Sequence, residues 1–366
     1  MRWIILLTMV DTFMRRFLLS LGLVKLMFML VCSCIVNWSK IEPVSYYLDN
    51  HPVSQINSSL TTTVDISKAV RLLANKNISF QGVIPVGKGF YIKSEQAEKW
   101  IENDLKNKDV LKLSSSAGDL TDNPHGKPSR WIIDFNNMSL EDASEYKLPF
   151  EHIKVNVKPE REINRDKKAR DFWWIFLRPR PEMRTAIESL TCCFSIPAHS
   201  KWFIFVPTSL DWLPNNSIHV VASDDFYILG ILTSNIHRIW IKAQSSTLKA
   251  DTRYTPNTCF ETFPFPQKPS QELVEKIRKT AGELHEYRSQ QMEKKQWGIT
   301  KLYNQFFNEP SSQLFQLHQK LDKLVMEAYH FQADEDILEK LLTLNLELAE
   351  KEKRGETVIG PWSPYS

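Results

Sequence analysis

The chain has 366 residues, of which 42% are hydrophobic, and this is enough to form the cores of two domains. Its 46 Lys and Arg residues nearly balance its 43 Asp and Glu residues, so the formal net charge is only +3. This balance excludes a partner selected by overall charge, and any electrostatic preference must come from local clusters. The five cysteines have neither the spacing of a disulfide framework nor that of a zinc site, so we expect inert core thiols.

One long apolar stretch lies near the N-terminus. Residues 17–36, FLLSLGLVKLMFMLVCSCIV, are interrupted only by Lys25 and follow two arginines, Arg15 and Arg16. This length and composition fit a membrane-spanning helix or a signal sequence. No other segment comes near 18 consecutive apolar residues, so the sequence predicts at most one span.

The next part of the chain predicts helices and strands in irregular alternation. We expect a helix over 64–77, two short strands around a turn over 78–92, a capped helix from 94, a strand over 130–135 and a short helix from 139. Such alternation favours an α+β fold over a regular parallel sheet.

Strands dominate the following region. TCCFSI, KWFIFVP and SIHVVAS predict three strands, and residues 224–244 then predict one helix. Asp224 or Asp225 is a plausible cap for that helix, and capping is favoured over the alternative of a metal-binding carboxylate pair. We expect His237 and His285 on helix surfaces rather than among metal ligands.

Beyond Pro269 the sequence predicts three amphipathic helices, which begin at Ser270 and near residues 311 and 334. Their apolar residues recur every three or four positions, so the simplest arrangement is an antiparallel bundle. The predicted fold class is therefore α+β, with a mixed domain followed by an all-helical C-terminal bundle.

The strongest local charge lies between residues 151 and 180, which hold nine Lys or Arg against five Asp or Glu. If a helix begins near Pro159, four of these cations share one face that could follow a phosphate backbone. The adjoining FWWIF and RPRP supply aromatic rings and rigidly spaced arginines, a mixture typical of nucleic-acid surfaces. The alternative is a solvated helix beside a core strand. The candidate DNA-binding residues here are Lys158, Arg161, Arg165, Lys168, Arg170, Arg178 and Arg180.

Signatures of catalysis are missing from the sequence. It contains no P-loop, nucleophile elbow or HExxH motif. The two glycines of GKGF, from Gly87, are not followed by a helix suited to a cofactor, so we expect a turn there. We therefore predict no catalytic, cofactor-binding or metal-binding residues.

Six stretches carry a resemblance to one family. They are SFQGVIPVGKGFYI, NPHGKPSRWIIDF, FEHIKVNVKPERE, RDFWWIFLRPRPEM, DDFYILGILTSNIHRIW and SSTLKADTRYTPNTCFETFPFP. In content and order they resemble the target-recognition domain and helical C-terminal region of bacterial type IIG restriction-modification enzymes, which are adenine-specific DNA methyltransferases fused to an endonuclease. The resemblance covers roughly residues 35 to 354.

The resemblance gives the connector over 245–266 a role at the junction between recognition domain and helical tail. Its prolines exclude both a helix and a central strand. We expect Lys249 and Arg253 on its exposed side, within reach of DNA. The residues expected to wedge into the junction are Phe260, Phe263, Pro264, Phe265 and Pro266.

The sequence also departs from the family. It has no Pro-Pro dipeptide, so it cannot form the (N/D)PPY site that holds a flipped adenine, and it has no Gly-rich cofactor motif. We therefore expect a non-catalytic specificity module that binds double-stranded DNA. The resemblance implies S-adenosylmethionine as the cofactor of the parent family, and methyl transfer would need a separate chain that bears the cofactor and (N/D)PPY sites. A separate methyltransferase/nuclease chain is thus a candidate partner beside DNA.

The resemblance also predicts a layout for a C-terminal piece of a longer enzyme located in the cytoplasm. The alternative is a membrane-tethered interaction protein, anchored through residues 17–36, whose helical tail binds a partner. The predicted layout is an apolar leader over 1–34, the end of a methyltransferase domain over 35–77, the recognition domain over 78–266, the helical region over 267–354 and a tail over 355–366.

Overall fold

The computed structural model describes residues 46–48, 51–53, 64–245, 247–248, 251–332 and 334–365. The chain divides into two compact units, Met1–Lys68 and Ala69–Ser366. In the first unit, β1 (Tyr46–Leu48) pairs antiparallel with β2 (His51–Val53), and a 3-10 turn covers Ile66–Lys68. The apolar stretch at 17–36 lies outside the described residues. Among the helices that are described, none has both the length and the apolar character needed to cross a membrane.

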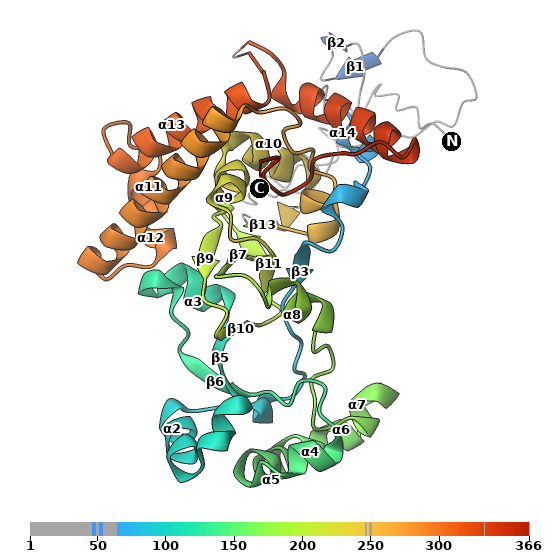
Figure 1. The fold of residues 1–366 in the computed structure, drawn as a ribbon, viewed down its shortest axis with the longest axis vertical. Coiled ribbons are helices and arrows are strands. Elements are labelled where there is room, and N and C mark those ends of the chain that lie inside the picture. The colour runs from blue at the N-terminus through green and yellow to red at the C-terminus, as the bar shows by residue number, and fades with distance from the viewer. Residues whose placement is uncertain are drawn as a thin grey trace, which may run out of the picture. The chain divides into compact units, whose positions relative to one another are not determined.

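The second unit contains three sheets (Figure 1). The first has the order β10-β5-β6-β4, the second β3-β11-β7-β9, and the third β12-β13-β8. The strands of the first two sheets are β3 (Ser79–Gln81), β4 (Tyr91–Ile92), β5 (Leu111–Ser115), β6 (Arg130–Ile133), β7 (Cys193–Pro197), β9 (Val206–Thr208), β10 (Trp212–Pro214) and β11 (Ile218–Val221). Those of the third are β8 (His199–Ser200), β12 (Thr247–Leu248) and β13 (Asp251–Arg253).

The helices of the second unit fall into two groups, one before and one after residue 190. Those before residue 190 are α2 (Ser94–Asn103), α3 (Ala117–Asp122), α4 (Leu140–Ser144), α5 (Lys147–Asn156), α6 (Lys158–Glu162), α7 (Lys167–Asp171) and α8 (Pro181–Ile187). Those after it are α9 (Phe226–Thr233), α10 (Asn235–Gln244), α11 (Gln271–Lys295), α12 (Ile299–Phe306), α13 (Gln313–Ala328) and α14 (Ile337–Lys353).

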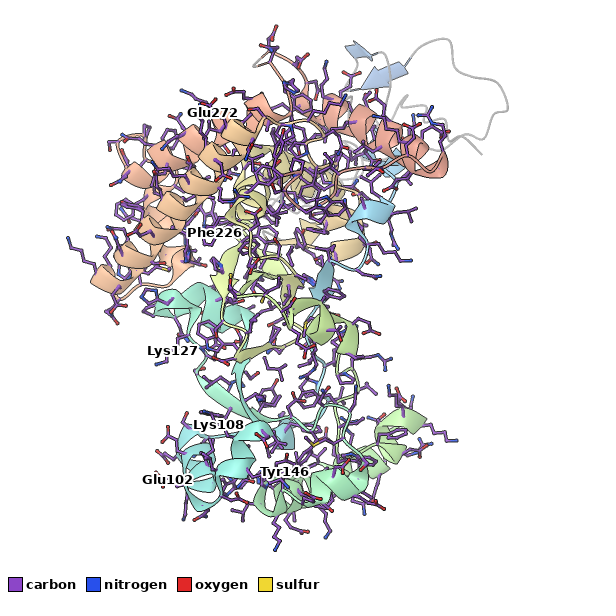
Figure 2. All side chains as sticks on the ribbon, viewed as in Figure 1. Glu102, Lys108, Lys127, Tyr146, Phe226 and Glu272 are labelled. Atoms are coloured by element: carbon purple, nitrogen blue, oxygen red, sulfur yellow. The ribbon has the colours of Figure 1, made fainter. Side chains whose placement is uncertain are left out.

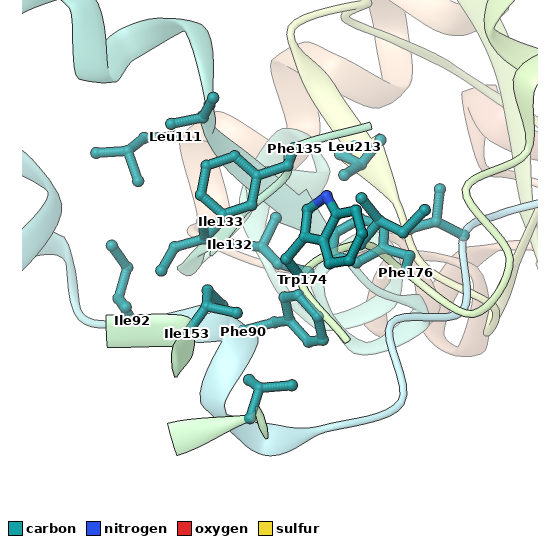
Figure 3. Close-up of a cluster of buried hydrophobic side chains, with 14 of the residues drawn as sticks. Phe90, Ile92, Leu111, Ile132, Ile133, Phe135, Ile153, Trp174, Phe176 and Leu213 are labelled. Carbon is teal, nitrogen blue, oxygen red and sulfur yellow. The ribbon is translucent and has the colours of Figure 1, made fainter. Parts of the chain in front are cut away.

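An aromatic and aliphatic core links the first sheet to the helices around it (Figure 3). Ile132 and Ile133 of β6 are fully buried, as are Phe90 and Phe135. Phe176 meets Phe90 edge to face with ring centroids 5.0 Å apart. The FWWIF stretch thus contributes mainly to the core, although Phe172 keeps 45% of its surface exposed.

The second sheet is joined to the tail helices through α9. Phe226 opens α9 and packs against Phe194 of β7 and His285 of α11 (Figure 2). Further along α9, a Cβ on Gly230 would lie 2.6 Å from Ile277 Cγ2 of α11, so the two helices approach closely. The bundle therefore includes α9 as well as helices of the tail.

The structure confirms the predicted fold class and corrects several elements. The expected helix over 64–77 is wrong, because only short 3-10 turns form there. The amide of Val70 donates instead to Asn345 Oδ1, and those of Leu73 and Ala74 donate to the Glu352 carboxylate. These tertiary partners replace the intrahelical bonds of a helix.

One predicted helix is divided, and two strand predictions are adjusted. The helix expected over 224–244 breaks at Ser234, whose hydroxyl accepts from His237 N and caps α10. Asp225 caps α9, so the capping prediction is confirmed.

KWFIFVP forms a strand only from Val206, because Phe203 takes a left-handed φ of 48°. The two strands expected over 78–92 are β3 and β4, and they join different sheets.

Candidate nucleic-acid interface

The basic segment does not form one continuous helix. The expected face through Lys158, Arg161, Arg165 and Lys168 is interrupted, since α6 ends at Glu162 and α7 begins at Lys167. Arg170 closes the gap by donating from Nη1 to the carbonyls of Asn164 (2.7 Å) and Arg165 (3.1 Å). The prediction of a single charged helix face is therefore wrong.

Arg161 lies inside the protein, with 1% of its surface exposed. Its guanidinium donates to the carbonyls of Val86 (2.8 Å) and Ile175 (3.2 Å), and also to that of Pro85. Burial lowers the pKa of this guanidinium. Arg161 thus joins α6 to two loops, and we leave it out of the candidate interface.

The remaining cations of α6 and α7 lie at the surface. Lys158 is partly engaged, because it forms an ion pair with Glu162 at 3.7 Å and lies over the Trp173 ring. Arg165, Lys168 and Arg170 are exposed and form no ion pair with the described residues. Lys158, Arg165, Lys168 and Arg170 form the first group of surface cations.

A second group of cations gathers at the edge of the second sheet. Arg180 has a left-handed φ of 59° and donates to Gln81 Oε1 at 2.8 Å, which holds its guanidinium beside β3. Arg178 is exposed, and its backbone pairs with Ile84. Burial, followed by the charge of Arg178, lowers the pKa of Arg180.

His219 of β11 lies close enough to this second group to be affected by the charges of Arg180, His199 and Arg253. It pairs with Gln81 across the strands, and Arg253 pairs with His199 between β13 and β8. Burial, together with the charges of Arg253, His199 and Arg180, lowers the pKa of His219 to about 4. Segments that are far apart in sequence, at 180, 199, 219 and 253, therefore share one electrostatic environment.

We call Arg178, Arg180, His199, His219 and Arg253 the arginine–histidine cluster. Neither Arg178, Arg180 nor Arg253 forms an ion pair with the residues that the structure describes. Arg253 and His199 are exposed. Sequence reasoning missed both histidines, and their signal was the strand pattern that places them beside two arginines. Lys249 lies outside the described residues.

The part of the connector over residues 260–266 lies mostly in the interior, where it joins several elements. The side chains of Phe260 and Phe263 are fully buried, that of Phe265 is 1% exposed, and Pro264 and Pro266 are also buried. Three of its carbonyls accept hydrogen bonds from side chains of distant segments. The donors are Asn75 Nδ2 to Phe263 O, Tyr329 Oη to Pro264 O and Asn345 Nδ2 to Thr262 O.

Several titratable groups are more buried than the sequence indicated. His237 was expected on a helix surface, but it is fully buried and donates from Nδ1 to the carbonyl of Leu232, 2.9 Å away. Burial lowers the pKa of His237 and that of His285 to about 4.

Burial also raises the pKa of the Cys193 thiol to about 11, and it raises the pKa of the Cys259 thiol. Cys32 and Cys34 lie outside the described residues.

The glycine turn at Gly87 and Gly89 is closely packed against other parts of the chain. A Cβ on Gly89 would lie 2.7 Å from Asn156 O, and one on Gly87 would lie 3.3 Å from Val157 Cγ1. The glycines therefore let the turn pack against the end of α5, and they leave no cradle for a cofactor. Asp224 and Asp225 bind Thr191 and the start of α9, and the described residues contain no cluster suited to a metal ion.

Together these features define a class of protein: an α+β module with exposed arginines, joined by a buried connector to a helical bundle. The sequence profile described as "MmeI, target recognition domain" matches residues 62–267. The chain belongs to this family.

Two known proteins show how much of a longer enzyme the chain corresponds to. DNA methyltransferase A of Bacillus subtilis (strain 168) is 31% identical over 232 residues, which are 61% of this chain and 25% of that protein. The structure of the type IIL restriction-modification enzyme MmeI in complex with DNA shares the fold, with a TM-score of 0.65 at 20% identity, over 83% of this chain and 39% of that one. The chain thus spans about a quarter of the curated relative, and the predicted resemblance to restriction-modification enzymes is confirmed.

Proposed function

We propose that this chain binds double-stranded DNA and recognises a specific sequence within it. The observation that carries this proposal is the arginine–histidine cluster, in which Arg180 and Arg253, from two distant segments, lie near His219 and form no ion pair with the described residues. Unpaired guanidinium groups bind phosphates and the edges of guanine in the major groove. The similar enzyme MmeI has been solved with DNA, which supports the same ligand here.

In this proposal Arg165, Lys168 and Arg170 contact phosphates, and Arg178, Arg180 and Arg253 position the module on the duplex. The proposed parent activity is N6-adenine methylation with S-adenosylmethionine. The groups for that chemistry would come from a methyltransferase region outside the residues matched here, because this sequence has no (N/D)PPY site. The predicted domain limits at 77, 266 and 354 and the cytoplasmic location remain part of this proposal.

Titration of the purified chain with duplex DNA at several salt concentrations tests this function. We expect affinity to fall steeply with salt, since each phosphate contact contributes a slope of about −0.9 in a plot of log K against log salt. Arg253→Gln should reduce that slope by about one, and Lys323→Gln on α13 serves as the matched control. Weak binding that salt leaves unchanged would contradict a phosphate-binding surface.

A further inference from the structure

A second group of lysines and aromatic rings lies on and around α12, outside the arginine–histidine cluster. Trp297 lies between two lysines, with Lys301 Nζ 4.5 Å and Lys295 Nζ 5.0 Å from its ring. The Trp297 ring stacks on Phe306 at an interplanar angle of 23°. Lys201 lies 4.6 Å over the ring of Trp202 in the same way.

The Lys201–Trp202 pair is bound to α12, the helix that carries Lys301, through Asn304. Asn304 Oδ1 of α12 accepts from Trp202 Nε1 at 2.9 Å and from Lys201 Nζ at 3.2 Å. Trp202 also packs against Phe307, with ring centroids 5.0 Å apart. We call Lys201, Trp202, Lys295, Trp297 and Lys301 the α12 surface.

The α12 helix is held rigidly on its inner side. Ile299, Leu302 and Tyr303 are buried, whereas Lys301 and Asn304 are exposed on the other side. A Cβ on Gly298 would lie 2.2 Å from Thr121 O, so the start of α12 sits directly against α3. The lysines are therefore presented from a fixed scaffold, which lowers the entropy lost when they bind a ligand.

The charge of the α12 surface is not neutralised by the described residues. None of Lys201, Lys295 and Lys301 forms an ion pair with them. The nearby carboxylate of Glu293 is engaged by His125 at 2.6 Å. Lysines without an ionic partner, held beside rigid rings, suit the phosphate backbone of a polyanion.

The α12 surface adjoins the arginine–histidine cluster at Lys201. Ser200, the residue before Lys201, belongs to β8 and pairs with Thr252 next to Arg253. We propose that the α12 surface is a second DNA-binding site, which contacts the phosphates of duplex DNA beside those bound by the arginine–histidine cluster. This inference rests on the proposed function and adds the helical tail to the interface.

The test compares the full chain with a triple variant, Lys201→Gln, Lys295→Gln and Lys301→Gln, on the same duplex DNA. We expect the salt slope to fall by about two to three and the affinity to fall roughly tenfold or more at moderate salt. Lys279 and Lys323 are exposed and form no ion pair with the described residues, so Lys279→Gln with Lys323→Gln is the control. Replacing the same three lysines by arginine should keep the slope, because the charge is retained.

The outcomes separate the two proposals. If the original chain binds DNA with a steep salt slope and the triple variant does so equally, the α12 surface does not bind DNA while the proposed function stands. If the original chain shows no salt-dependent binding, the proposed function itself fails. Equal urea unfolding of the variant and the original chain makes a loss of binding attributable to the lost charges.

Discussion

Arg161 shows how a single residue can carry charge in the sequence and act as a structural support in the fold. Its spacing with other cations predicted an exposed helix face. In the structure its guanidinium instead donates hydrogen bonds to several carbonyls of two loops. Hydrogen bonds to these carbonyls offset the cost of burying the charge. The phosphate-binding role therefore falls to exposed neighbours such as Arg165.

We expect Arg161→Met to lower the free energy of unfolding by about 2–4 kcal/mol, because buried carbonyls would lose their donor. Arg165→Met removes the same charge from an exposed position and should change it by less than about 0.5 kcal/mol. Urea unfolding of both variants measures the difference. Equal stability of the two would show that the buried hydrogen bonds contribute little.

At the scale of elements, sequence periodicity identified the long helices and missed their interruptions. The apolar pattern from Ser270 predicted α11, because a helix with one buried face repeats that pattern over many turns. The break at Ser234 was missed, since almost every residue of α9 is buried and the sequence shows no change of face there. The arginine–histidine cluster depends on strand pairing between distant segments, which local patterns do not record.

The contact of α9 with the tail predicts opposite effects for two glycines. Gly230→Ala should lower the free energy of unfolding by about 1–3 kcal/mol, since the added methyl would overlap Ile277 and crowd Leu321. Gly282 in the middle of α11 has only Phe226 as a neighbour at 4.0 Å, so Gly282→Ala should stabilise by up to about 1 kcal/mol. Thermal or urea unfolding distinguishes these results, and stabilisation by both would contradict the tight packing of α9.

At the scale of the whole molecule, buried histidines predict how stability depends on pH. Burial lowers the pKa of His219, His237 and His285 to about 4, whereas an unfolded histidine titrates near about 6.5. The unfolded chain then binds more protons than the folded chain below about pH 6.5. The stability these groups provide is complete above that pH and is lost progressively as pH falls towards 4.

We therefore expect the free energy of unfolding to fall by about 1 kcal/mol for each of these histidines between pH 7.5 and pH 5.5. Urea unfolding at the two values measures the change. His237→Asn, which keeps a donor for Leu232 O, should reduce the fall. A stability that is constant over this interval would show that these side chains are not shielded from water as the structure describes.

The central claim for the whole molecule is sequence-specific recognition of duplex DNA, and selection from a pool of randomised duplexes tests it most directly. The purified chain is mixed with the pool, bound duplexes are recovered over several rounds, and their sequences are compared with the starting pool. We predict enrichment of one short sequence, and recovery of a smaller fraction of the pool when Arg180 and Arg253 are both replaced by glutamine. Recovery of DNA with no enriched sequence, or of none at all, would contradict the account.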